Sequence, residues 1–446
     1  MKIKNIHKAK LAVALVALSA GFASCSDQPD KYTTTDGTPT ISYVRPIDVA
    51  SKDSLLTTAS MGDAICIVGS NLRSVTQINF NDQSAVLNTS FMTDNTIIVN
   101  VPKTLPESVT DKIYFITASQ DTVTYQFSVS IPAPTITGMS NEWAAAGELV
   151  NITGDYFLTY EDGDESHKLS VRVGDDYVIP YEKMSISKNT IAFNMPEDMP
   201  EHKNIYITTK YGTTKAPFQY KDNRGMLFDF DTPNALTGTV LGNHGWHDAV
   251  IRQDATSLKG NYVMLGNTKM DAAGSWNDQN FAFEYWAGTW DYDFSGSGPK
   301  LCDIADFSDW NNKSIKFEMC IPSANPWMAA PMQVIFAGTD KVVYFNANNT
   351  FFCKQNTLGR ALYTPWKDTG SYDTSDQWQT VTIPLKDFTY DWDGNTLKST
   401  FTSVDDFASL TIFVVRGTYD DKTVSPEGTD CTPIIKIDNI RVVPNK

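Results

Sequence analysis

The stretch GELVNITG at residues 147–154 repeats the stretch GDAICIVG at residues 62–69. In both, apolar side chains alternate with small or polar ones between two glycines, which is typical of a short strand bounded by turns. A second pair, NTIIVNVP at residues 95–102 and NTIAFNMP at residues 189–196, follows at a corresponding place in each half. The chain therefore carries one β-rich unit twice.

The spacing of the two copies defines two domains. The glycine-bounded stretches lie 85 residues apart and the proline-ended stretches lie 94 apart, and an acidic insertion at residues 161–168 accounts for the difference as a solvated loop. We predict small β-sandwiches at residues 39–132 and 133–221. At the repeated stretches both copies resemble the IPT/TIG immunoglobulin-like (Ig-like) domain, which implies a spacer or interaction module. Trp143 lies near the predicted junction, where packing is favoured over ligand contact.

The remaining part of the chain, residues 222–446, shows period-two alternation without a strong amphipathic helix. Apolar and polar side chains alternate at residues 314–321, 379–385, 410–415 and 434–443. Strands without helices pack as two sheets. We therefore predict a larger, jelly-roll-like β-sandwich here, and an all-β fold for the whole chain.

Aromatic residues concentrate in this C-terminal part. Nine of the ten Trp lie after residue 222, many of them in segments rich in Gly, Pro, Asn and Asp. A flat aromatic side chain buries the apolar face of a sugar ring, while Asn, Asp, Lys and Arg side chains bind the hydroxyl groups at its edge. The composition of these segments therefore predicts a polysaccharide ligand.

Three loop aromatics are the leading candidates for glycan contact. Trp327, Tyr363 and Trp366 lie beside Pro, which keeps them out of strand interiors. Rigid rings on exposed loops bind a ligand at little conformational cost. We therefore predict that these three side chains form the binding platform.

Two further Trp belong to the predicted glycan-binding set. Trp286 and Trp290 lie in the aromatic cluster YWAGTWDY, whose central Gly288 argues against a helix. By contrast, Trp310 and Trp378 adjoin predicted strands and are expected to pack against the core or its edge.

The N-terminus carries an export signal. Four Lys precede a short apolar run at residues 11–20, which is too short to span a bilayer. The sequence FASC resembles a bacterial lipobox in which Cys25 is diacylated, although Phe22 stands where Leu is usual. We predict a signal peptide at residues 1–24 and a lipidated tether at residues 25–38, whose SDQPD stretch resembles the export tag of Bacteroidetes surface lipoproteins. The alternative is ordinary signal-peptidase cleavage nearby.

The charge balance excludes two kinds of partner. The chain has 36 basic and 52 acidic side chains, and residues 1–24 contain four Lys and no acid, so the processed chain carries a net charge of −20. Such a chain repels nucleic acid and anionic membrane surfaces. A neutral glycan is not affected.

Two strand motifs resemble a known family. They are WQTVTIPL at residues 378–385 and DNIRVVP at residues 438–444, and the order of parts agrees with them: lipid Cys, tandem Ig-like domains, aromatic-rich sandwich. All resemble the surface glycan-binding proteins of Bacteroidetes polysaccharide-utilisation systems. The resemblance implies a cell-facing outer-membrane lipoprotein that binds xyloglucan or another β-glucan beside a glycan transporter complex. We predict a binding protein, not an enzyme.

Two alternatives to this function stay open. A glycoside hydrolase needs two carboxylates roughly 5–9.5 Å apart, one of them with a raised pKa. The C-terminal part contains only three Glu, and Glu318 alternates with Lys316 on a strand side expected to face solvent, so no catalytic residue is predicted. A purely structural or adhesive surface protein is the other alternative, but it leaves the aromatic loops unexplained.

No cofactor or metal site is predicted. His244 and His247 have a metal-compatible spacing without a third ligand. Asp229 and Asp231 lie near the start of the C-terminal domain and Asp438 lies near its end. This placement resembles that of the ligands in carbohydrate-binding sandwiches that hold a structural Ca²⁺ where their two termini meet. A structural Ca²⁺ is therefore left as an open alternative.

Overall fold

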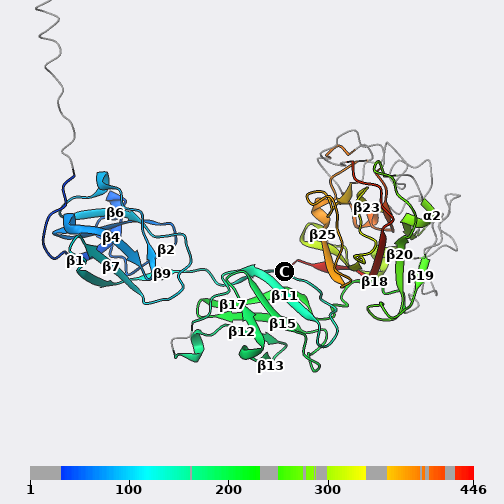
Figure 1. The fold of residues 1–446 in the computed structure, drawn as a ribbon, viewed down its shortest axis with the longest axis horizontal. Coiled ribbons are helices and arrows are strands. Elements are labelled where there is room, and N and C mark those ends of the chain that lie inside the picture. Colours follow the sequence, from blue (N-terminus) through cyan, green and yellow to red (C-terminus); the bar gives the residue numbers. More distant parts are fainter. Residues whose placement is uncertain are drawn as a thin grey trace, which may run out of the picture. The chain divides into compact units, whose positions relative to one another are not determined.

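Strands make up almost all of the regular structure (Figure 1). Among the residues that the structure describes, two short α-helices, α2 (Asp278–Phe281) and α3 (Leu301–Ile304), and several short 3-10 helices interrupt them. By its internal contacts the chain divides into two compact units, residues 1–132 and 133–446. The computed structural model describes residues 32–160, 163–231, 250–274, 278–285, 287, 299–337, 359–391, 394–396, 401–416 and 427–445. Within these ranges no helix is long and apolar enough to cross a membrane. The predicted signal peptide and Cys25 lie outside them.

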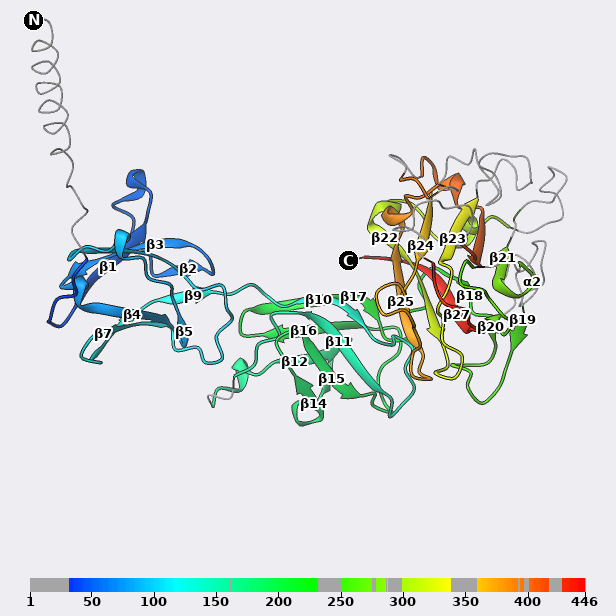
Figure 2. The same ribbon diagram turned by 45° about the horizontal axis from the view of Figure 1, so that its top comes forward.

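The first unit is a sandwich of two antiparallel sheets, ordered β1-β3-β6 and β5-β4-β7-β8, with a short parallel β2-β9 pair (Figure 2). Inward-facing Ile, Val and Phe side chains fill the space between the sheets. The strands are β1 (Thr40–Pro46), β2 (Thr58–Ser60), β3 (Ala64–Ser70), β4 (Val75–Phe80), β5 (Gln83–Ser84), β6 (Thr96–Asn100), β7 (Lys112–Thr117), β8 (Thr122–Gln126) and β9 (Ser128–Ser130).

The second unit begins with a sandwich of the same design, ordered β10-β11-β15-β14 and β13-β12-β16-β17. Seven strands of the two domains correspond in sheet order, while among the described residues β14 has no counterpart in the first domain and the β2-β9 pair has none in the second. The prediction of tandem Ig-like sandwiches is confirmed. The strands are β10 (Thr135–Met139), β11 (Leu149–Asp155), β12 (Ser170–Val173), β13 (Tyr177–Ile179), β14 (Met184–Ile186), β15 (Thr190–Asn194), β16 (Asn204–Thr209) and β17 (Gly212–Gln219).

The repeated glycines have one physical cause. Gly69 and Gly154 end the two quoted stretches where the first strand of each domain shifts its register. A Cβ at Gly69 would lie 2.0 Å from the carbonyl oxygen of Thr40, and one at Gly154 would lie 1.9 Å from that of Thr135. Only glycine permits this approach of two backbones. The same contact in both domains therefore explains why the same residue recurs.

The C-terminal part is the larger two-sheet sandwich that the alternation predicts. One sheet is ordered β19-β20-β27-β22-β25, with β18 also paired to β27, and the other is ordered β21-β26-β23-β24. One continuous core of aromatic and branched side chains lies between them. The strands are β18 (Met226–Phe228), β19 (Val250–Arg252), β20 (Tyr262–Gly266), β21 (Ala282–Tyr285), β22 (Lys313–Cys320), β23 (Met332–Ala337), β24 (Arg360–Tyr363), β25 (Gln379–Pro384), β26 (Ser409–Val414) and β27 (Ile434–Pro444).

The central strand β22 is buried on both faces, because the second Ig-like domain covers its outer side. Glu142, from the loop between β10 and β11, accepts hydrogen bonds from Arg441 at 2.8 Å and from Lys316 at 2.5 Å. Glu318 on β22 also binds Arg441, at 2.8 Å, and is 0% exposed. The prediction that Glu318 faces solvent is therefore wrong. Its covering partner comes from another domain, which the alternation within one strand cannot reveal.

Candidate functional site

One end of the second sheet of the C-terminal sandwich gathers several connecting segments. β21 ends at Tyr285, β23 ends at Ala337, β24 begins at Arg360 and β26 begins at Ser409. The strand register places these four residues at the same end of the sheet. The described ends of β21 and β23, from which these segments continue, therefore lie at the same end of the sheet, with β26 between them.

Trp286 and Trp290 belong to the segment after β21 and lie outside the described residues. The ends of that segment are described. The N–H of Ala287 donates to a serine hydroxyl at the start of β26 at 2.8 Å. The hydroxyl of Tyr285 donates to the carbonyl of Pro299. Ala287 and Pro299, at the two described ends of the segment, are therefore both hydrogen-bonded to residues of the sheet.

Trp327 and Trp366 lie in the core, with 0% and 2% of their surface exposed. Both indole N–H groups donate to the carbonyl oxygen of Ala330, at 3.0 and 2.9 Å. The prediction that these two rings form an exposed binding platform is therefore wrong. A neighbouring Pro keeps a residue out of a strand interior, but it does not keep the side chain out of the core.

Tyr363 reaches the surface from the same cluster. Its ring is half-buried and lies 6.2 Å from the ring of Trp327. It lines a groove of about 410 Å³ between β24 and β25, which are edge strands of the two sheets. The other residues that line the groove are Ala361, Leu362, Thr382, Ile383, Pro384, Asp387, Thr389 and Tyr390.

The composition of this groove suits a sugar chain. Two tyrosine rings and four aliphatic side chains supply apolar surface for the faces of sugar rings. Thr382, Asp387 and Thr389 supply hydrogen-bonding groups for hydroxyls. The arrangement can bind a glycan by stacking and hydrogen bonding, without any charge on the ligand.

A hydroxyl relay holds Tyr363 in place. Its hydroxyl donates to Tyr372, whose own hydroxyl donates to the side-chain oxygen of Gln379 at 3.2 Å. Burial raises the pKa of Tyr363, and the charge and hydrogen bond of Tyr372 add to the rise. Tyr363 is therefore a neutral, positioned phenol across the physiological pH range.

Tyr390, which also lines the groove, was not among the residues predicted from the sequence. Its main chain exchanges two hydrogen bonds with Arg360, at 2.9 and 3.1 Å, and so closes one side of the sandwich at the start of β24. The surrounding sequence DFTYDWDG alternates aromatic and acidic residues in a turn-rich segment. This pattern could have indicated Tyr390 as a candidate, because the other candidates were chosen from aromatic-rich loops of the same kind.

The aromatics predicted to pack do so. Trp378 is 8% exposed and its ring lies 5.8 Å from that of Tyr262. Trp310 is half-buried, with its ring 6.0 Å from that of Phe407. Trp143 is also 8% exposed. The prediction of packing is therefore correct for these three aromatics, whereas the prediction of exposure is wrong for Trp327 and Trp366.

Two carboxylates of the described residues come close together without forming a hydrolytic pair. Glu142 and Glu318 both bind Arg441 and are 1% and 0% exposed. Burial raises the pKa of Glu318, and the guanidinium of Arg441 opposes the rise. A polysaccharide cannot reach either group, so their proximity serves the domain interface.

The described residues hold no group of three or more His, Cys, Asp or Glu side chains placed to bind a metal ion. Asp438 is 1% exposed, and its Oδ2 has no hydrogen-bond partner. Burial raises the pKa of Asp438 to about 9, with Asp231 and Asp229 adding to the rise. His244 and His247 lie outside the described residues.

Comparison with known proteins identifies the class. Residues 220–444 match the family described as "Surface glycan-binding protein B xyloglucan binding domain", and residues 134–221 match the IPT/TIG domain. Together with the fold, these matches define an all-β, multidomain glycan-binding protein. Because the first match spans half of the chain, the chain belongs to the surface glycan-binding protein B family. The predicted family is confirmed.

Three relatives illustrate the range of similarity. The crystal structure of the surface glycan-binding protein PbSGBP-B from Prevotella bryantii is 56% identical and covers 92% of this chain and 100% of that chain, with a TM-score of 0.82. SGBP-B from a complex xyloglucan utilization locus in Bacteroides uniformis is 16% identical over 92% of this chain and 100% of that chain, with a TM-score of 0.43. An IPT/TIG domain-containing protein of Bacteroides ovatus is 26% identical over 231 residues, 50% of this chain and 42% of the relative. The chain thus spans less than half the length of that curated relative.

Proposed function

We propose that this chain is a non-catalytic, cell-surface lipoprotein that captures xyloglucan, or another neutral β-glucan, through aromatic side chains of its C-terminal domain. The observation that carries the proposal is the match of residues 220–444 to the xyloglucan-binding domain of the family. The 56% identical Prevotella bryantii protein, which is named a surface glycan-binding protein, supports the same ligand class.

The proposed contact surface has two parts. Tyr363 and Tyr390 line the groove beside β24, at one edge of the four-stranded sheet β21-β26-β23-β24. The opposite edge of this sheet is β21, which Trp286 and Trp290 follow in the sequence. Three strand spacings, roughly 14 Å, separate the two edges. A chain of several sugar rings is long enough to contact both parts.

The anchor and the transport partner belong to the same proposal. Lipidation of Cys25 would hold the chain at the outer membrane, and the tether behind it would leave the folded part outside the cell. A neighbouring outer-membrane transporter complex would then receive the captured glycan. The lipobox-like sequence FASC and the export-tag-like sequence SDQPD support this arrangement.

The absence of catalysis is also part of the proposal. Binding through stacked rings needs no general acid or nucleophile, and Glu142 and Glu318, which both bind Arg441, are buried at a domain interface. A capture protein of this kind would hold the polysaccharide without shortening it.

Affinity gel electrophoresis of the soluble chain from residue 39 onward tests the proposal. The gels contain xyloglucan, a mixed-linkage β-glucan or, as a charged control, polygalacturonate. We expect xyloglucan to retard the protein and polygalacturonate to have no effect, because a stacked neutral sugar exchanges no ions. Retardation by none of the neutral glycans would favour a structural or adhesive protein. Release of reducing sugar would favour the hydrolase.

A further inference from the structure

The two Ig-like domains differ at one sheet edge. In the second domain β14 pairs along the outer edge of β15, with Met184 opposite Phe193 and Ile186 opposite Ile191. The equivalent of β15 in the first domain is β6, and there the sheet order ends, β1-β3-β6. Within residues 32–132, which the structure describes throughout, no strand covers the outer edge of β6.

The first domain keeps only the beginning of this pairing. Met92 forms a single bridge with Ile97. The residues before it form the short 3-10 helix η3 (Thr89–Phe91), which is capped by the side chain of Asn88. The pairing therefore stops after one bridge, and most of β6 keeps a free edge.

The main-chain groups of Ile98 and Asn100 point toward this free edge. Val101 uses its opposite side: its N–H donates to the carbonyl of Asp63 at 2.9 Å, and its carbonyl accepts from the N–H of Gly62 at 2.9 Å. An antiparallel strand alternates its bonding side from one residue to the next. The bridge of Met92 with Ile97 uses the N–H of Ile98, so the carbonyl of Ile98 and both main-chain groups of Asn100 remain for another strand to pair with.

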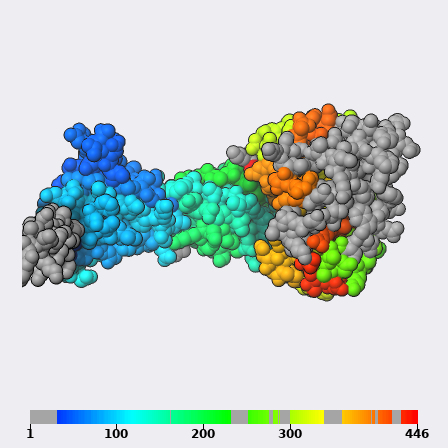
Figure 3. Space-filling view, turned by 90° about the horizontal axis from the view of Figure 1, so that it is seen from above, coloured from blue at the N-terminus to red at the C-terminus, as the bar shows by residue number. Residues whose placement is uncertain are grey.

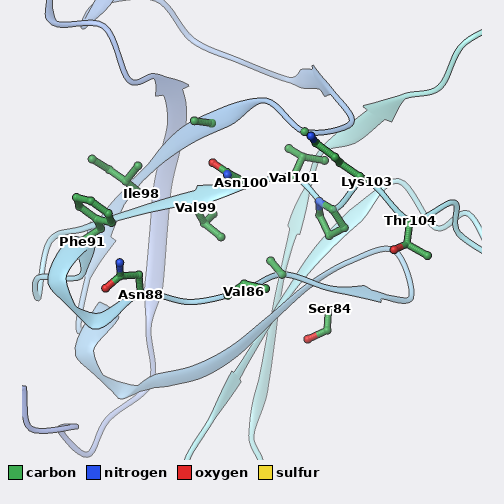
Figure 4. Close-up of a pocket in the computed structure, with 14 residues that line it drawn as sticks. Ser84, Val86, Asn88, Phe91, Ile98, Val99, Asn100, Val101, Lys103 and Thr104 are labelled. Atoms are coloured by element: carbon green, nitrogen blue, oxygen red, sulfur yellow. The ribbon is translucent and has the colours of Figure 1, made fainter.

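A groove of about 640 Å³ follows this edge (Figure 4). Phe91 and Ile98 lie at one end of it, and Lys103 and Thr104 lie at the other. Val86, Phe91 and Ile98 are 89%, 55% and 38% exposed. Contiguous large apolar side chains that are left exposed in this way mark an interaction surface.

The groove has one charge. Of the 14 residues that line it, Lys103 alone carries a charged side chain. A strand added antiparallel to β6 would start near Lys103 and end near Phe91, so an acidic residue at its start would meet the ammonium group. β14 has this order of residues, with Glu182 two positions before Met184 and Ile186 two positions after it.

We infer that β6 is a docking strand for an extended peptide segment of a protein partner. The segment adds antiparallel to β6, pairs with the carbonyl of Ile98 and with both main-chain groups of Asn100, and places alternate apolar side chains against Phe91 and Val86. It begins with an acidic residue near Lys103. A peptide is favoured over a glycan because a sugar chain lacks the regular N–H and C=O groups that an open strand edge pairs with.

A peptide from the chain itself tests this inference. The probe is a fluorescein-labelled peptide with the sequence of residues 180–189, PYEKMSISKN, titrated into the soluble full chain and followed by anisotropy. We expect saturable binding, and slower amide hydrogen exchange in residues 96–100 of the complex. Ile98→Lys should weaken binding at least tenfold. The matched control, Leu55→Lys, changes a residue that is 70% exposed and does not line the groove, and should bind normally.

Four results would overturn the inference. The first is the absence of saturable binding, and the second is equal binding by Ile98→Lys and the control. The third is protection of residues 96–100 by xyloglucan and not by the peptide, which would make the groove a glycan site. The fourth is a concentration-dependent dimer that Ile98→Lys abolishes, which would make a second copy of the chain the occupant.

Discussion

The loop after the first strand is buried in the second Ig-like domain, whereas the corresponding loop of the first domain is exposed. The loop that joins the first two strands of the second domain packs on the C-terminal sandwich, so Glu142 and Trp143 are 1% and 8% exposed. The corresponding loop of the first domain leaves Ile47, Val49 and Leu55 exposed by 48%, 77% and 70%. This segment, dark blue in the space-filling view, stands out from the rest of the first domain (Figure 3).

This difference shows that one repeated fold serves two purposes. In the second domain the loop, the linker and the sandwich share one buried polar network: the N–H of Lys221 donates to the carbonyl of Glu142 at 2.7 Å, and Arg224 binds the fully buried Asp222 at 2.6 Å. The second domain is therefore a structural part of the proposed binding unit. The first domain keeps its own core and presents free surfaces, as expected of an interaction module.

Truncation should separate the two roles with the largest effect. A fragment of residues 133–446 keeps the whole buried network and should unfold as the longer chain does. A fragment of residues 222–446 lacks Glu142 and exposes the outer face of β22 to water, so its free energy of unfolding should be clearly lower than that of the 133–446 fragment. Urea unfolding followed by circular dichroism measures both. Equal stability of the two fragments would mean that the second Ig-like domain is only a spacer.

A single substitution tests the same interface. Glu142→Ala leaves Lys316 and Arg441 buried without one of their carboxylates, and should lower the free energy of unfolding by about 3–5 kcal/mol. The control is Val49→Ala in the corresponding loop of the first domain, which should change it by less than about 0.5 kcal/mol. If both substitutions change the free energy of unfolding by a similarly small amount, the loop of the second domain contributes no more to stability than the exposed loop of the first domain does.

Much of the fold could be predicted from the sequence because its signals are local. The repeated glycines mark a close approach of two backbones, and period-two alternation marks strands, so the number and type of domains follow from residues near one another in the chain. The burial of β22 on both faces could not be predicted. Its outer face meets Glu142, 174 residues from Lys316 in sequence, and no pattern within the strand indicates that contact.

The candidate site was less predictable than the fold. Trp327 and Trp366 were chosen because Pro excludes them from strands, but their indoles meet at the carbonyl of Ala330, a residue with a φ of 62°. A non-glycine residue with positive φ cannot be recognised from its own identity. Tyr363 was chosen for the same reason and lines the groove, because it ends an edge strand.

The free energy of unfolding of the C-terminal sandwich should also depend on pH, because of Asp438. Asp438 keeps its proton in the folded state up to its pKa of about 9, whereas the unfolded chain releases it near pH 4. The folded state is thus most favoured at low pH, and this contribution is lost progressively as the pH rises toward 9. Asp438→Asn should therefore raise the free energy of unfolding at pH 8 by at least ~1.4 kcal/mol, the equivalent of one pKa unit.

Thermal unfolding of this variant between pH 5 and 8 checks the prediction and also examines the calcium alternative. We expect the wild-type protein to lose stability over this range relative to Asp438→Asn, with no effect of added Ca²⁺ on either. A wild-type protein that gains stability from Ca²⁺, together with a destabilised variant that does not, would instead identify Asp438 as a calcium ligand.

Calorimetric titration of xyloglucan into Tyr390→Ala tests the central claim, that aromatic faces of the C-terminal groove bind a neutral glycan. We predict that Tyr390→Ala weakens binding about tenfold, or ~1.4 kcal/mol, since the stacking face is lost. Tyr390→Phe keeps the ring and should bind within about twofold of the wild-type protein, and both variants should melt near the wild-type temperature. Wild-type affinity in a folded Tyr390→Ala variant would contradict the claim and exclude the groove as the binding surface.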